Sequence, residues 1–330
     1  MSPKTQRVLA GDVGGTHARL ALFEVAEGKP TLLTETIFPS GEYQGLEPIV
    51  LAFLRKTGEK VDRGCIGVAC PVEGGVCHAA NLGWDIQAEG FGQAVGIPRL
   101  KIINDFEAVG YGIPELEPHD LETLQEGVPQ EKGPIGLIGA GTGLGQGFLL
   151  WEQGRYVVHA SEGGHADFAP ADLTQWNLFV HLKATDGHVS WERIVSGHGL
   201  VAAYEFLRDS AYAPESDDLR RECQEKDMAG VISHHALAGG DPLSAKAMEI
   251  FLYAFGAQAG NLALTLRTTG GIYLCGGIAP KILPLLEAGP FLGAFRDKGR
   301  LSELVQRIPV RVIVNESVGL WGAAAVAGRL

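Results

Sequence analysis

An acid, two glycines and a hydroxyl stand together near the start of the chain, in Asp12-Val13-Gly14-Gly15-Thr16. Glycines let the backbone approach a ligand closely, so successive N–H groups from Gly14 to Thr16 could surround a phosphate. Asp12 then stands where a metal-bound nucleotide needs a carboxylate, as a direct ligand or through water. The flanking apolar residues predict strand, turn and strand, a pattern that an ordinary glycine hairpin would also explain.

A second stretch repeats this plan. An aliphatic run leads into a glycine and threonine turn at Gly141, Thr142 and Gly143, after which an apolar strand follows. Two such hairpins predict a duplicated fold whose turns hold the phosphates of one nucleotide. A third glycine turn, at Gly276 and Gly277, follows another apolar strand and could accommodate an adenosine.

Polar side chains also follow the strand predicted over Leu100–Ile103, at Asn104 and Asp105. Ligands of open α/β sheets bind at the carboxyl ends of strands, which makes these two residues candidates for a binding site. Asp105 could instead be the N-cap of the helix that follows. The residues at this point leave both explanations open.

Two further clusters carry groups that could contact a ligand. Glu162, His165 and Asp167 could bind a metal ion. Glu192 stands in Ser190–Arg193, which looks like the first turn of a helix. The helix dipole alone favours an acid there, so Glu192 also has an ordinary structural explanation.

Taken in order, these motifs closely resemble those of the bacterial glucokinases, within the hexokinase, actin and Hsp70 fold superfamily. The stretches that carry the resemblance are Asp12–Thr16, Ile103–Phe106, Gly139–Gly145, Glu162–His165, Ser190–Arg193 and Gly276–Gly277. The resemblance covers almost the whole chain. His17 and His198 depart from the family pattern, at positions to which we assign no chemistry.

The resemblance implies an α/β, two-lobed actin-like ATPase (ribonuclease H-like) fold, with duplicated mixed sheets flanked by helices and a cleft between the lobes. Residues 1–113 with 315–330 would form a small domain, and residues 114–314 a large one. The segment Ile113–Gly133 would be the crossover between them. An Ala-rich helix over Gly319–Leu330 would then return to the first lobe.

The implied activity is transfer of the γ-phosphoryl group of ATP to the 6-hydroxyl of glucose, feeding glycolysis. Asp105 would be the catalytic base, and the sugar-binding residues would be Asn104, Asp105, Glu162, His165 and Glu192. The two phosphate turns, with Gly276 and Gly277, would bind ATP, and Asp12 would hold Mg2+ through water. No zinc site is expected, because the cysteine cluster that follows the matching histidine in zinc-binding relatives is absent.

Alternatives to this activity remain within and outside the enzyme class. The chain could be a kinase for mannose, fructose or an N-acetylhexosamine, or a sugar-sensing protein of the same fold without turnover. Polyphosphate could also replace ATP as the donor. Retention of both Asp12 and Asp105 weighs against a sensor, because a pure binder needs no base at the sugar.

Composition limits the partners. The 27 basic and 39 acidic residues give a net charge of −12, which disfavours nucleic acid and anionic membranes. The five cysteines contain no C-x-x-C pair, which predicts reduced thiols in a cytoplasmic protein and neither disulfides nor zinc. An apolar export segment is not expected at the N-terminus. The resemblance makes a homodimer the expected assembly.

Apolar spacing predicts the remaining elements of interest. Pro71–Trp84 is loop-rich, and it could lie near the sugar or form a surface hairpin. Asp218–Ala238 is expected to be one charged, amphipathic helix, and Leu243–Arg267 one long buried helix. The uncharged part of the latter is too polar to span a membrane.

Overall fold

A computed structural model describes residues 5–70, 72–73, 75–79 and 82–330. The chain divides into two compact units. Unit 1 comprises Met1–Asp120, Gly154–His159 and Asn315–Leu330, and unit 2 comprises Leu121–Gln153 and Ala160–Val314. The C-terminal segment therefore belongs to the same unit as the N-terminal hairpin.

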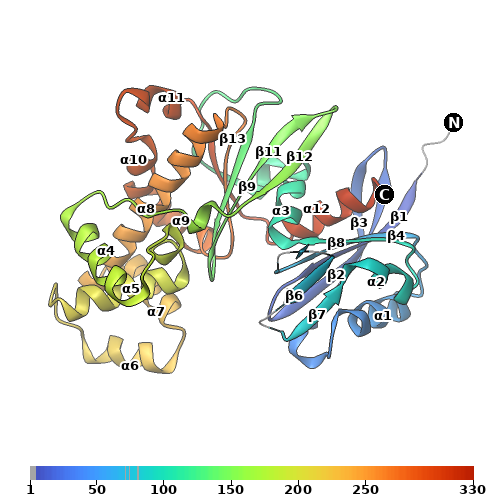
Figure 1. Ribbon diagram of the computed structural model, residues 1–330, viewed down its shortest axis with the longest axis horizontal. Helices are drawn as coiled ribbons and strands as arrows, with labels where there is room; N and C mark the ends of the chain where they lie inside the picture. Colours follow the sequence, from blue (N-terminus) through green and yellow to red (C-terminus); the bar gives the residue numbers. More distant parts are fainter. Residues whose placement is uncertain (1–4, 71, 74, 80–81) are drawn as a thin grey trace. The chain divides into compact units, whose positions relative to one another are not determined.

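Unit 1 is built on a five-stranded mixed sheet with the order β3-β2-β1-β4-β8 (Figure 1). Its strands are β1 (Gln6–Val13), β2 (His17–Ala26), β3 (Lys29–Pro39), β4 (Arg63–Val68) and β8 (Arg99–Asn104). β1 is antiparallel to β2 and parallel to β4, and β4 is parallel to β8. The parallel strands bring the ends of β1, β4 and β8 to one edge of the sheet.

Half of the loop-rich segment Pro71–Trp84 belongs to a second, three-stranded sheet. Its strands are β5 (Val72–Glu73), β6 (Val76–Ala79) and β7 (Trp84–Gln87). Pairing is antiparallel throughout, so this is a hairpin with a third strand added. Residues 71, 74, 80 and 81 of the segment lie outside the described residues.

Alternate residues of β1 face two different cores, as the period of a strand requires. Val8 and Ala10 pack with the C-terminal helix through Leu320, whereas Leu9 packs with α1 through Ile49. The helices of this unit are α1 (Leu46–Thr57), α2 (Ala88–Ala94), α3 (Asp105–Gly112) and α12 (Val318–Ala327). The C-terminal helix thus completes the core of the N-terminal sheet.

The second large sheet has six strands in the order β12-β11-β10-β13-β14-β9, and every strand except β12 lies wholly in unit 2. Its strands are β9 (Leu121–Gln125), β10 (Ile135–Ala140), β11 (Leu144–Glu152), β12 (Arg155–Ser161), β13 (Gly271–Cys275) and β14 (Val310–Ile313). β10 is antiparallel to β11 and parallel to β13, which is parallel to β14. The pairing pattern of β2, β1, β4 and β8 is repeated here, which confirms the predicted duplication. β9 lies within the expected crossover, where the sequence analysis placed no strand.

The helices of unit 2 include one long buried helix, α8, which confirms the prediction for that segment. They are α4 (Leu173–Asp186), α5 (Gly197–Asp209), α6 (Asp217–Glu225), α7 (Met228–Ala238), α8 (Pro242–Leu266), α9 (Leu283–Glu287), α10 (Pro290–Arg296) and α11 (Ser302–Gln306). Within the part of the chain that the structure describes, no helix combines the length and apolar character needed to cross a membrane.

The single helix expected over Asp218–Ala238 is wrong, because the structure has two helices there. Ser216 caps α6 by accepting the N–H of Leu219 at 3.2 Å. Asp227 caps α7 by accepting the N–H of Gly230 at 2.9 Å. Each cap satisfies an N–H group that a helix start leaves without an intrahelical partner.

Candidate active site

The first glycine turn joins β1 to β2 and is held closed from both sides. Gly14 donates its N–H to the carbonyl oxygen of His17 at 2.9 Å. Ser40 donates its hydroxyl to Gly14 O at 3.0 Å and its N–H to Thr16 O at 2.9 Å. Gly15 and Thr16 are exposed at the tip, where their backbone is accessible to a ligand.

Asp12 lies two residues before this turn, opposite Arg19 on β2. The pKa of Asp12 is raised to about 6; burial is the main cause, the negative charge of Asp105 acts in the same direction, and Arg19 opposes both. The first turn of α12 also reaches this carboxylate, since a Cβ on Gly319 would lie 3.1 Å from Asp12 Oδ2. Asp12 is therefore a partly desolvated acid whose ionised form a nearby cation would stabilise.

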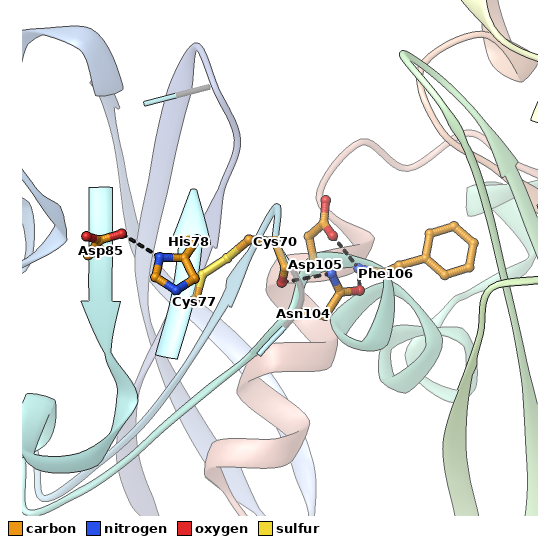
Figure 2. Close-up of a disulfide and its surroundings, with 7 residues drawn as sticks. All are labelled: Cys70, Cys77, His78, Asp85, Asn104, Asp105 and Phe106. Atoms are coloured by element: carbon orange, nitrogen blue, oxygen red, sulfur yellow. Dashed lines mark hydrogen bonds and ion pairs between the residues drawn. A yellow bond between two sulfur atoms is a disulfide. The ribbon is translucent and has the colours of Figure 1, made fainter. Parts of the chain in front are cut away.

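Asn104, and not Asp105, is the N-cap of α3. The Asn104 Oδ1 atom accepts the N–H of Phe106 at 2.9 Å and that of Glu107 at 3.3 Å. Asp105 is the first residue of the helix, with its carboxylate 2.8 Å from the Phe106 nitrogen (Figure 2). Burial raises the pKa of Asp105 against the lowering effect of this hydrogen bond. The interpretation of Asp105 as the N-cap is wrong, so its carboxylate needs another explanation.

The second glycine turn lies between β10 and β11, and one of its glycines is explained by a close contact. Gly141 donates to Gly143 O at 2.9 Å, and Gly197 donates to Gly141 O at 2.9 Å. Leu144 donates its N–H to Glu192 Oε2 at 2.9 Å. A Cβ on Gly143 would occupy the space of that carboxylate oxygen. Gly143 is thus required for Glu192 to reach the turn.

Glu162, His165 and Glu192 come together in unit 2. His165 lies between the acids, with Nδ1 4.0 Å from Glu192 Oε1 and Nε2 4.0 Å from Glu162 Oε2. The chain segments meet because Trp191 donates its N–H to Ala166 O at 3.0 Å. Asp167 does not join this group.

The segment Ser190–Arg193 is not the start of an α-helix. Trp191–Arg193 forms one 3-10 turn, and α5 begins only at Gly197. A single turn has few aligned peptide dipoles, so the explanation of Glu192 by a helix dipole is wrong.

Among the described residues, no group of three or more His, Cys, Asp or Glu side chains is arranged to hold a metal ion.

The third glycine turn adjoins a cavity of about 810 Å³ within unit 2, which Thr142 and Gly277 both line. Gly276 has φ +83°, and a Cβ there would collide with Ala140 O, so only glycine fits. Met228 and Ile278 add apolar surface to the lining. The second and third turns therefore share one cavity.

Sequence reasoning missed several residues of this cavity. Asp227, His234 and Lys281 line it, and so does His198, to which no chemistry was assigned. These residues form no motif in the sequence. Asp227 could have been recognised only as the cap of α7, which brings its side chain to the start of that helix.

Comparison with known proteins identifies the family. The Glucokinase family model matches residues 9–330. A glucokinase from Nostoc punctiforme is 44% identical over 339 aligned residues, covering 98% of this chain and 99% of the relative. This chain belongs to the glucokinase family. A glucokinase from Escherichia fergusonii is 39% identical over 322 aligned residues, covering 97% of each chain.

Solved structures agree with the fold of this glucokinase-family chain. A glucokinase from an Antarctic psychrotroph superimposes with a TM-score of 0.86 at 30% identity, covering 98% of this chain and 99% of that one. A ROK family glucokinase from Streptomyces griseus, solved with glucose and AMPPNP, gives 0.64 at 22% identity, covering 98% and 100%. The expected α/β fold and the resemblance to glucokinases are confirmed.

One expectation about this glucokinase-family chain is corrected. The cysteines were expected to be reduced thiols, but Cys70 and Cys77 form a disulfide, with their Cα atoms 5.8 Å apart. That separation lies in the usual range for disulfides. The pair was missed because the two residues come together only through the pairing of β6 with β5.

Proposed function

We propose that the chain transfers the γ-phosphoryl group of ATP to the 6-hydroxyl of glucose, with Asp105 as the catalytic base. The observation that carries this proposal is the Asp105 carboxylate, which is partly buried at the end of β8 while Asn104 serves as the cap. A raised pKa makes a carboxylate a better proton acceptor. Asp105 would take the hydroxyl proton as the phosphoryl group is transferred.

Five residues would bind the sugar in this proposal. Their side chains offer carboxylate, amide and imidazole groups to the ring hydroxyls, and hydrogen bonds to charged acceptors are stronger than neutral ones. They are Asn104, Asp105, Glu162, His165 and Glu192. Support comes from unit 2, where His165 lies between the two glutamates.

The glycine turns would hold ATP. Gly14, Gly15 and Thr16 of the first turn would contact phosphate oxygens through backbone N–H groups. Gly141, Thr142 and Gly143 would do the same from the second turn. The cavity that Thr142 and Gly277 line, together with Gly276, would accommodate the adenosine.

Mg2+ fits the residues present at the first turn. Asp12 offers the hard oxygen ligand that Mg2+ prefers, and Mg2+ commonly uses one or two protein carboxylates together with waters and substrate phosphates. The partial burial of Asp12 beside a second acid favours a neighbouring cation. When bound, the ion would neutralise charge on the transferred phosphoryl group.

A coupled assay for ADP formation across several hexoses tests this function. We expect Mg-ATP-dependent turnover with kcat/KM highest for glucose, loss of turnover with a chelator, and full recovery with Mg2+ alone. Higher kcat/KM for mannose, fructose or an N-acetylhexosamine would identify a different hexose kinase. Sugar binding without ADP formation would identify a sensor, and recovery only with zinc would contradict the assignment of Mg2+.

We expect the affinity for Mg-ATP to fall as the pH drops below about 6, because a protonated Asp12 no longer offers an anionic oxygen. Asp105→Asn removes a charge that raises the pKa of Asp12, so it should move the midpoint to lower pH. Calorimetric titration of both proteins between about pH 5 and about pH 8 measures this. Protonation of the nucleotide affects both proteins equally. Equal midpoint pH values for the unmodified protein and Asp105→Asn would therefore contradict the electrostatic coupling between Asp105 and Asp12.

The raised pKa of Asp12 also makes the free energy of unfolding depend on pH. The folded state binds a proton at Asp12 more tightly than the unfolded chain does. The contribution of this group to the free energy of unfolding therefore falls as the pH rises from 3.8 to about 6.

The chain is further proposed to be a cytoplasmic homodimer. Leu173, Trp176 and Val180 lie on α4 with exposed apolar side chains. Spacings of three and four residues place them on one side of the helix, which supports an interface there. Sedimentation equilibrium showing only monomers at micromolar concentration would contradict the dimer.

A further inference from the structure

The disulfide between Cys70 and Cys77 lies next to the candidate catalytic base. Cys70 follows β4, and Cys77 is in β6 with its side chain fully buried. Figure 2 shows the sulfur bridge on the side of Asn104 that faces away from Phe106. Neither cysteine belongs to the motifs that carry the resemblance to glucokinases.

The carboxamide of Asn104 connects this disulfide to the start of α3. Its Nδ2 atom donates to the carbonyl oxygen of Cys70 at 3.2 Å, while its Oδ1 atom accepts the N–H of Phe106. Both ends of the amide are therefore bound, which fixes the plane of the side chain. The Cys70 carbonyl oxygen thus helps to fix the orientation of the Asn104 amide.

The backbone around Cys70 also contacts the strand that leads to the first phosphate turn. Ala69 donates its N–H to Val13 O at 3.1 Å, and Cys70 donates to Val68 O at 2.7 Å. On the other side of the bridge, His78 lies 2.6 Å from Asp85 across β6 and β7. The disulfide therefore joins a segment fixed by β4 to one fixed by the small sheet.

We propose that the Cys70–Cys77 disulfide is a reversible redox site that positions Asn104, and that its reduction by a dithiol weakens glucose binding. This inference rests on the proposed role of Asn104 in binding the sugar. Without the bridge, only the short pairing of β5 with β6 ties the segment after Cys70 to the small sheet, and the carbonyl oxygen of Cys70 holds the Asn104 amide less firmly. Glucose binding must then order the Asn104 amide, which lowers the affinity for glucose.

The reduction is a thiol–disulfide exchange with a dithiol as the reductant. A thiolate of the dithiol attacks one sulfur of the bridge, the Cys70–Cys77 bond breaks, and a mixed disulfide forms. The second thiol of the reductant then displaces the protein thiol. In sum, two electrons and two protons pass to the cysteines, and the dithiol becomes a disulfide.

The hairpin offers a route for this exchange. β5 contributes only Val72 and Glu73 to the pairing with β6, so little backbone hydrogen bonding has to open before the buried sulfurs are reached. Burial raises the pKa of the Cys65 and Cys223 thiols, which keeps them protonated and poorly nucleophilic. Cys65 and Cys223 should therefore not attack the bridge.

The experiment compares the oxidised protein with the same protein reduced by dithiothreitol, with the number of free thiols counted by maleimide labelling and mass spectrometry. We expect reduction to expose two additional thiols and to raise the KM for glucose about two- to tenfold, the worth of one hydrogen bond. The double variant Cys70→Ser/Cys77→Ser should have the KM for glucose of the reduced protein, and dithiothreitol should not change that value. Cys223→Ser is the matched control, because it removes a thiol elsewhere and should keep the full response.

A second variant separates positioning of Asn104 from a general loosening of the fold. Asn104→Ala should bind glucose more weakly and show no further change in KM on reduction, since it has no amide to position. An undiminished response in Asn104→Ala would overturn the proposal, as would equal KM values for oxidised and reduced protein or no disulfide after oxidation. If glucose is still phosphorylated in those cases, the proposed function stands and only this inference fails. Absence of turnover in both redox states would refute the proposed function and this inference together.

Discussion

Asp105→Asn should lower kcat by about 10²–10⁴ while glucose still binds, because a positioned general base typically contributes that factor. The amide has the shape of the carboxylate and can still accept the N–H of Phe106, so the start of α3 should keep its geometry. It cannot accept the proton of the sugar hydroxyl. Measurements of kcat, of glucose affinity by calorimetry and of the melting temperature test this expectation.

Glu107→Gln is the control for Asp105→Asn. It makes the same change from acid to amide on the same helix, at a residue whose ion-pair partner is Lys101 at 3.8 Å. Its kcat should stay close to that of the unmodified protein. Near-normal kcat in Asp105→Asn, or equal losses in both variants, would refute Asp105 as the base.

Gly143→Ala should raise the KM for glucose about ten- to hundredfold, because its Cβ would displace the carboxylate of Glu192. The displacement would break the hydrogen bond from Leu144 and move Glu192 relative to His165. Hydrogen bonds to charged groups contribute about 1.5–3 kcal/mol, which corresponds to this range. The KM for ATP should change less, and steady-state kinetics with each substrate varied in turn measures both values.

Two further variants show whether Glu192 is the cause. Gly293→Ala adds a methyl group in α10, where nothing lies within 4 Å, and should leave both KM values unchanged. In a Glu192→Ala background the collision is absent, so Gly143→Ala should add little to the loss. Additive effects of Gly143→Ala and Glu192→Ala would mean that the glycine acts independently of the acid.

The duplicated plan and the family are evident from the residues alone. Strand, glycine turn and strand occur together within short stretches at Asp12 and at Thr142, and such local patterns depend on backbone freedom and apolar alternation. The buried helix over Leu243–Arg267 was predictable for the same reason, since its apolar residues recur at short intervals along the chain. Periodicity does not predict the split of Asp218–Ala238 into two helices, because the break depends on the cap that Asp227 provides for α7.

The contacts among the candidate groups depend on packing and could not be predicted from residue spacing. Asn104, and not Asp105, is the N-cap of α3. The Glu192 carboxylate accepts the N–H of Leu144 beside Gly143, and Cys70 forms a disulfide with Cys77. His198 lines the cavity beside Gly277, although its place in the sequence suggested no role. Most of these contacts join segments that are separated along the chain, and their geometry depends on how strands and helices pack. Residue type and spacing therefore predicted which groups could act, whereas packing decided which of them meet.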